Sequence, residues 1–412
     1  MNSLNDLAWE NLINETDLIP KVKKAGLTYI TANEMKKYRE PRLMAKIDTK
    51  ELLPKVFNRN NLSILPVRNG EYAIFYDPKR LSFFNFRNGF DQLPVIQYAP
   101  AVNFSKFESF ENLENLKESQ ALDTALMASI IKHFTNEDDL WLTLRGRHYS
   151  KNFKVFVPSI TQFIRVSGVQ IEIDAGYESE KAIYIFEAKI GKRENFNIRQ
   201  LLFPYLEWKN RTSKPVIPIF FFFSNGYYYL FQFNLTESLD ESSIIKQACY
   251  TLSDIQSFHI ENEIKEAKLE ESLVEGIPFP QANDLDKVID TISLVHQGYD
   301  NKEDIAEILE FDTRQGDYYA NAASYIGFLN REDNRYSLTK EGETFLKLQS
   351  PSERAKDIVR QLVKRPVFFQ IFQYLLNGEL NLVFLDNINI PNMTLLQKRL
   401  DKVYPNYRFA KN

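Results

Sequence analysis

The chain has 412 residues, of which 44% are apolar and 14% aromatic. This composition can fill more than one hydrophobic core, and the length predicts two to four domains. Its formal net charge of −4 gives no overall attraction to nucleic acid, so a DNA-binding function would require local basic surfaces. The single cysteine, Cys249, excludes an intrachain disulfide and a zinc site built from several cysteines.

The N-terminal region, residues 1 to about 105, starts without the basic and hydrophobic pattern of a secretory signal. No apolar run reaches membrane-spanning length, which predicts a cytoplasmic protein with no membrane partner. We expect helices first, then two strands around the turn Arg68-Asn69-Gly70. Five basic residues before these strands suit either phosphate contact or, more simply, a solvated helix face. They are Lys36, Lys37, Arg39, Arg42 and Lys46.

Helical spacing of apolar residues then runs from Glu118 to Phe134 and predicts one helix packed under a sheet. The next segment, residues 140–159, is expected to form strands on either side of a turn that contains Gly146. It carries a series of basic residues, Arg145, Arg147, His148, Lys151 and Lys154. Because this segment immediately precedes the stretch described next, phosphate contact and an ordinary structural turn are equally good interpretations.

Two strands that each end on an acid follow. Apolar and polar residues alternate from Val169 to Asp174, and an apolar run from Ala182 to Phe186 leads directly into Glu187. The polar segment between them contains Gly176 and suits a hairpin turn. Side chains alternate along a strand, so Glu187 and Lys189 share a face, as do Glu172 and Asp174. Pairing the two strands would bring Asp174, Glu187 and Lys189 together.

Two carboxylates and a lysine at strand ends are the groups that metal-assisted hydrolysis of a phosphodiester uses. An acid, any residue and a lysine is a weak pattern alone, because most copies are solvated surface charges. Other copies begin at Glu34, Asp48, Asp77, Glu263, Glu266 and Asp300. The copy at Glu187 differs because an apolar strand and an acid-terminated strand precede it.

Asp174 followed by Glu187-Ala188-Lys189 resembles the signature of the PD-(D/E)xK nucleases, and the chain is similar to type II restriction endonucleases of that superfamily. The resemblance implies a multidomain α/β (α+β) fold whose core is a central mixed sheet flanked by helices. It also implies that Asp174 and Glu187 bind Mg²⁺ and that Lys189 serves the attacking water. Glu172 either supports this site or pairs with a basic neighbour.

A helix is expected from Asn195 to Trp208, with Arg199 and Gln200 in its first turns. In many members of the superfamily a glutamine on this helix supports the site, which makes Gln200 a candidate. An acid on the upstream helix is often a further metal ligand, so Glu118 is the candidate there and Asp123 the alternative.

Asn225-Gly226, between two aromatic and apolar runs, is a strong hairpin signal after this helix. The resulting order of strand, strand, helix and strand is the order that the nuclease core requires. We expect this core to span residues 106–275, with a charged helical connector from about residue 254.

Residues 276–350 change pattern and predict three helices, a short β-hairpin and another helix, the arrangement of a winged helix-turn-helix. The third helix, approximately Arg314 to Phe328, would enter the major groove. The polar residues near its start are Arg314, Gln315, Tyr318, Tyr319 and Asn321. Such folds also mediate protein contacts, but the neighbouring nuclease-like region favours DNA. Residues 351–412 are expected to form a C-terminal helical tail.

Together these features predict a Mg²⁺-dependent, sequence-specific endonuclease that cuts double-stranded DNA and acts as a homodimer, in the same system as a DNA methyltransferase that protects the host. The DNA-contacting candidates are Arg145, Arg147, Lys151, Arg314, Gln315, Tyr318 and Tyr319. A repair or structure-specific nuclease on the same core is one alternative. A DNA-binding regulator with an inactive core is the other.

Overall fold

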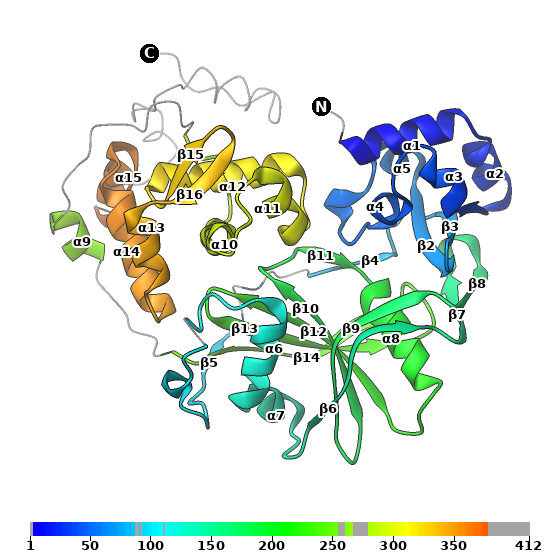
Figure 1. Ribbon diagram of the computed structural model, residues 1–412, viewed down its shortest axis with the longest axis horizontal. Coiled ribbons are helices and arrows are strands. Elements are labelled where there is room, and N and C mark those ends of the chain that lie inside the picture. Colours follow the sequence, from blue (N-terminus) through cyan, green and yellow to red (C-terminus); the bar gives the residue numbers. More distant parts are fainter. Residues whose placement is uncertain are drawn as a thin grey trace. The chain divides into compact units, whose positions relative to one another are not determined.

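The computed structural model describes residues 3–86, 90, 93–109, 112–253, 260–266 and 279–377 (Figure 1). The chain forms two compact units. Unit 1 comprises residues 1–103, 116–223 and 227–252, and unit 2 comprises residues 104–115, 224–226 and 253–412. No helix within the described ranges is both long and apolar enough to span a membrane.

The first part of unit 1 is a lobe of short helices around a three-stranded antiparallel sheet in the order β1-β3-β2. Trp9, Met35 and Phe57 lie in its core, and the predicted turn Arg68-Asn69-Gly70 joins β2 to β3. Its elements are α1 (Leu4–Asn14), α2 (Leu18–Ala25), β1 (Leu27–Thr31), α3 (Ala32–Lys36), α4 (Pro41–Ala45), η1 (Lys50–Leu52), α5 (Lys55–Asn60), β2 (Leu62–Arg68) and β3 (Glu71–Tyr76).

The second part of unit 1 is built on a seven-stranded mixed sheet in the order β5-β14-β13-β12-β10-β9-β6, which confirms the predicted mixed α/β class with helices flanking a central mixed sheet. Helices α6 and α8 both contact β10 (Figure 1). The strands are β5 (Val95–Gln97), β6 (Trp141–Tyr149), β9 (Gln170–Glu178), β10 (Ile183–Ile190), β12 (Val216–Ser224), β13 (Tyr227–Leu235) and β14 (Ser242–Thr251), and the helices are α6 (Glu118–Met127), α7 (Ile130–Thr135) and α8 (Arg199–Lys209).

The hairpin predicted at Asn225-Gly226 is confirmed. Both residues have positive φ, 51° and 77°, as a tight two-residue turn between twisted strands requires. The strand β10 runs parallel to β12, and α8 makes the crossover between them. The predicted order of strand, strand, helix and strand is therefore present along this part of the chain.

Four local predictions were wrong, and each has a cause in the backbone or its packing. The single helix expected from Glu118 to Phe134 is broken into α6 and α7, because Ser129 adopts a left-handed conformation with φ of 67°. Gly146 lies inside β6 with φ of 88°, where the pairing with β9 shifts, so it marks a bulge instead of a turn.

Gly176 likewise lies inside β9, beneath Leu144, because a Cβ atom there would come within 2.7 Å of the Leu144 Cβ. The β9–β10 turn is instead made by residues 179–182, where the Ser179 hydroxyl accepts hydrogen bonds from the backbone of Lys181 and Ala182. The start of the helix predicted from Asn195 is a strand, β11 (Asn195–Asn197), paired with β4 (Phe83–Asn85).

This β4–β11 pair ties the N-terminal lobe to the chain segment between β10 and α8. The buried Asp48 accepts a hydrogen bond from the Arg199 guanidinium at 2.7 Å through its carboxylate, and another from the Asn197 backbone through its carbonyl. The Asn195 side chain accepts from the Lys50 backbone at 2.7 Å. The lobe therefore fixes where α8 begins.

A separate hairpin, β7 (Asn152–Val157) with β8 (Gln162–Ser167), follows β6 after one short turn, and the one-turn helix η3 (Pro158–Ile160) lies between its strands. Phe153 and Val155 on β7 and Ile164 and Val166 on β8 are buried in the core that also contains α8. The hairpin contacts α8 and β2 (Figure 1). Only one of its faces is therefore used by the fold.

Unit 2 contains the three helices, the antiparallel hairpin and the following helix that the sequence predicts. A close approach between α11 and α12 is made possible by Gly316, because a Cβ there would lie 2.4 Å from the Lys302 carbonyl oxygen. The elements are η2 (Phe104–Lys106), α9 (Ile260–Glu266), α10 (Leu285–His296), α11 (Lys302–Leu309), α12 (Thr313–Ile326), β15 (Leu329–Glu332), β16 (Arg335–Leu338), α13 (Lys340–Leu346), α14 (Pro351–Val363) and α15 (Pro366–Leu376).

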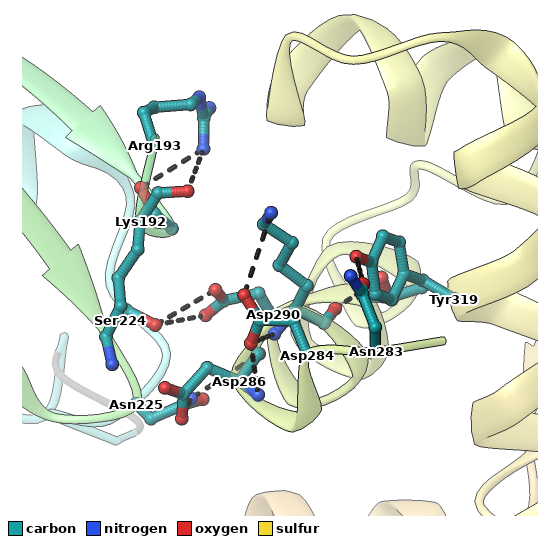
Figure 2. A network of polar contacts seen from close by, with 12 residues as sticks. Lys192, Arg193, Ser224, Asn225, Asn283, Asp284, Asp286, Asp290 and Tyr319 are labelled. Atoms are coloured by element: carbon teal, nitrogen blue, oxygen red, sulfur yellow. Dashed lines mark hydrogen bonds and ion pairs between the residues drawn. The ribbon is translucent and has the colours of Figure 1, made fainter. Parts of the chain in front are cut away.

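Two segments distant in sequence complete unit 2. The Ser224 hydroxyl donates to the Asp290 carboxylate at 2.9 Å, and the Asn225 amide donates to Asp286 at 2.9 Å (Figure 2). The Asn112 amide donates to the carbonyl of Leu346 at 2.7 Å. In the predicted connector and tail, residues 254–259, 267–275 and 378–412 lie outside the described residues.

We expect Gly316→Val to lower the free energy of unfolding of unit 2 by about 1–3 kcal/mol, because the new side chain collides with the α11 backbone. Urea denaturation followed by circular dichroism would measure the loss. Gln315→Val is the matched control, since that neighbouring position is only half-buried and should change stability by about 0.5 kcal/mol or less. An equal loss in both variants would contradict the close-approach argument.

Candidate active site

The antiparallel ladder between β9 and β10 ends where the candidate acids begin. The last paired residues are Phe186 and Ala175. Beyond them, the Ala188 backbone N–H donates a hydrogen bond of 2.7 Å to the Asp174 carboxylate instead of to a β9 carbonyl. On the other side of β9, one residue of β6, Arg145, faces two of β9, Asp174 and Ala175, which places a bulge at Asp174. Bulges of this kind redirect a side chain.

Two polar side chains donate hydrogen bonds to Glu187. The Lys189 ammonium donates to Glu187 Oε1 at 2.8 Å, and the Gln200 amide donates to the same oxygen at 2.9 Å. Glu187 and Lys189 share a strand face, as alternation predicts, and their side chains are 11% and 13% exposed. Gln200 comes from the first turn of α8. The structure thus places Asp174, Glu187, Lys189 and Gln200 around one strand end.

Burial dominates the electrostatics of both acids. It raises the pKa of Glu187 well above its usual range, and the negative charges of Asp174 and Glu118 raise it further. Lys189 opposes this shift through its charge and hydrogen bond. The pKa of Asp174 is also raised by burial, against the opposing effects of Lys189 and the Ala188 N–H. Two neighbouring acids with raised pKa values are typical of functional sites.

Each carboxylate keeps one oxygen for a ligand. Neither Oδ1 of Asp174 nor Oε2 of Glu187 accepts a hydrogen bond from any described residue. The buried Gln200 Oε1 also lacks a hydrogen-bond partner within the described part of the chain. Carboxylate oxygens suit Mg²⁺, which commonly uses only one or two protein carboxylates.

The candidate third ligand, Glu118, lies at the start of α6 and is half-buried. It is near enough to raise the pKa of Glu187 by charge repulsion. No group of three or more His, Cys, Asp or Glu side chains in the described ranges is arranged to hold a metal ion. The inference of a metal site therefore rests on the pair Asp174 and Glu187.

Arg145 is held by the fold at this site. Its guanidinium donates to both oxygens of Asp123, at 2.5 and 3.2 Å, and its Nε donates to the Asp174 backbone carbonyl at 3.0 Å. Arg145 thereby satisfies the backbone of the bulged strand and links it to α6. Asp123, the alternative metal ligand, is committed to this ion pair.

The other predicted phosphate contacts nearby differ in their surroundings. Arg147 lies 3.6 Å from the Glu172 carboxylate on the neighbouring strand, and both side chains are about half exposed. Glu172 therefore pairs with a basic neighbour, one of the two roles open to it from sequence. Lys151 is exposed in the turn before β7, where its backbone N–H donates to Glu207.

The predicted DNA-contacting residues on α12 differ in how deeply they are buried. Arg314 is exposed, and Gln315 and Tyr318 are half-buried near the start of the helix. Tyr319 is only 3% exposed, lies in the core of unit 2 and donates its hydroxyl to Asn283 (Figure 2). Asn321 is also buried and accepts from Arg331 of the hairpin. Packing therefore removes Tyr319 and Asn321 from the surface.

Sequence reasoning missed the buried acids among the acid-x-lysine copies. Asp48 is bound to Arg199, Asp77 accepts from Ser63 and Ser82, and Glu263 is paired with Arg360. All three are less than 10% exposed. The pattern cannot separate them from solvated copies, because burial comes from contacts with residues distant in sequence.

Three family models match successive parts of the chain, and each is described only as a domain of unknown function: DUF6996 over residues 6–74, DUF6997 over residues 85–251 and DUF7226 over residues 287–390. No curated protein and no solved structure matches the chain. The second model includes Asp174, Glu187, Lys189 and Gln200, and the third begins within α10 and extends past α15.

We expect Asp174→Asn to stabilise the protein at pH 8 and to have little effect at pH 4, as measured by urea denaturation in EDTA. The pKa of Asp174 is higher in the folded than in the unfolded state, so its charge costs stability as pH rises through the folded pKa. Glu172→Gln is the control: this acid is exposed, so its replacement should not stabilise the protein at pH 8. A loss of stability at pH 8 alone would contradict the burial argument.

Proposed function

We propose that this protein is a Mg²⁺-dependent endonuclease of double-stranded DNA, of the PD-(D/E)xK restriction endonuclease kind. The observation that carries the proposal is the meeting of Asp174, Glu187 and Lys189 at one strand end, with one oxygen of each carboxylate available to a ligand. Two further observations support it. The strands β10 and β12 run parallel, with α8 as the crossover between them, and Gln200 donates a hydrogen bond to Glu187.

Asp174 and Glu187 are the residues that would hold the ion. Mg²⁺, when bound there, would supply Lewis-acid stabilisation of the negative charge that develops on the phosphate. Lys189, oriented by its hydrogen bond to Glu187, would hold the water that attacks phosphorus. Attack forms the new phosphorus–oxygen bond as the bond to the leaving sugar oxygen breaks. Gln200 would keep the Glu187 carboxylate in place.

Unit 2 would act as a winged helix that holds or reads the DNA. Three helices followed by an antiparallel hairpin support this assignment. Arg314, Gln315 and Tyr318, near the start of α12, would face the major groove. A homodimer would allow both strands to be cut, and a DNA methyltransferase in the same system would protect the host.

Plasmid digestion with Mg²⁺ or with EDTA separates the proposal from its alternatives. Discrete fragments that require Mg²⁺ support a restriction enzyme. Preference for branched over linear substrates would favour a repair nuclease. Tight DNA binding without any cutting would favour a regulator with an inactive core.

We expect Asp174→Ala and Lys189→Ala each to reduce cleavage at least about 100-fold, because one removes a metal-binding carboxylate and the other the group that orients water. DNA binding in EDTA should be retained, as measured by fluorescence anisotropy. Glu172→Ala, two residues from Asp174 but exposed and paired with Arg147, should cut normally. Full cleavage by either site variant would refute the site.

We expect Arg314→Ala to weaken DNA binding and to reduce the slope of log affinity against log salt concentration by about 0.9 if the residue contacts one phosphate, or to relax sequence preference if it contacts a base. Lys340→Ala, at the start of α13, is a control with the same loss of charge. Unchanged affinity and sequence preference in Arg314→Ala would remove α12 from the DNA contact.

A further inference from the structure

The β7–β8 hairpin has one face that the fold does not use. Side chains alternate along both strands, and those on the inner face are buried beside α8. The register places the outward residues in three directly opposed pairs. These pairs are Asn152 with Ser167, Lys154 with Arg165, and Phe156 with Phe163.

Lys154 and Arg165 form a like-charged pair on this face. Residues directly opposite in an antiparallel pair have Cβ atoms about 5 Å apart, where like charges are destabilising. Both side chains are exposed, and no carboxylate of the described residues lies within 4 Å of either. By contrast, Arg145 and Arg147 on β6 are each paired with an acid. Of these four basic residues, the two on the hairpin are therefore the ones whose charge no described carboxylate compensates.

An aromatic pair continues the same face. The ring of Phe163 is 55% exposed and lies 5.0 Å from that of Phe156, measured between centroids. The hairpin is also close to the candidate site along the chain, because β8 ends at Ser167 and β9, which carries Asp174, begins at Gln170. A surface that is both basic and aromatic suits a polyanion whose charged phosphates alternate with sugar rings.

We propose that the outward face of the β7–β8 hairpin contacts the backbone of double-stranded DNA, with Lys154 and Arg165 each meeting a phosphate and Phe163 lying against a deoxyribose. This inference rests on the proposed function and moves the main phosphate contact from β6 to the hairpin. Charge complementarity selects the partner, because an anionic polymer relieves the repulsion between the two cations.

The test compares the unaltered chain with Lys154→Gln/Arg165→Gln by fluorescence anisotropy on a random-sequence duplex in EDTA over a range of KCl concentrations. The slope of log affinity against log salt concentration should fall by about 1.8, the value for two phosphate contacts. Lys154→Arg/Arg165→Lys, which keeps both charges, should restore it. Lys23→Gln/Lys24→Gln on α2 loses the same charge from another exposed surface and should keep the original slope.

The outcomes separate the two ideas. An unchanged slope in the hairpin variant, while the unaltered chain binds DNA, would overturn the hairpin contact and leave the proposed function standing. An equal fall in the α2 control would also overturn it, because the effect would then be one of net charge. If the unaltered chain binds no DNA, both proposals fail. The melting temperature of the hairpin variant should not decrease, because the substitution removes a repulsion.

Discussion

The hydrogen bond from the Ala188 backbone to the Asp174 carboxylate is the interaction on which the candidate site depends. It ends the β9–β10 ladder by replacing a backbone acceptor with a side chain. Past that point the two strands are no longer paired with each other. Glu187 and Lys189 occupy this stretch of β10, and the cost of burying their charges is offset by their mutual hydrogen bond and by Gln200.

Two supports hold this strand end. Arg145 satisfies the bulged backbone of β9 and binds Asp123 of α6. In addition, Asp48 of the N-terminal lobe binds Arg199, the residue next to Gln200. The lobe therefore contributes to the position of α8 although none of its residues reaches Glu187 by a hydrogen bond within the described chain. This gives residues 1–105 a physical role that their sequence did not indicate.

Charge is distributed unevenly over a chain whose formal net charge is −4. On β6, the arginines are paired with acids from α6 or β9 and stabilise local structure. On the hairpin that follows, Lys154 and Arg165 face each other across the two strands. Basic residues that are close in sequence therefore have different surroundings, and a net charge cannot distinguish them.

Several features could be predicted from the sequence alone: the mixed α/β class, the hairpins at Gly70 and Gly226, the helices and hairpin of unit 2, and the nearness of Glu187 to Lys189. These features depend on local periodicity and on residues with special backbone preferences, which act over a few positions. The strand pairing that brings Asp174 to Glu187 was also predictable, because the two strands are consecutive.

Other features could not be predicted from the sequence: the bulge at Asp174, the break at Ser129, the burial of Tyr319 and the pairing of Arg145 with Asp123. The same is true of the bond between Asp48 and Arg199, which are 151 residues apart in the sequence. Each of these depends on which distant surfaces pack together, and packing changes the burial, partners and charge of a residue without changing the local pattern that a sequence displays.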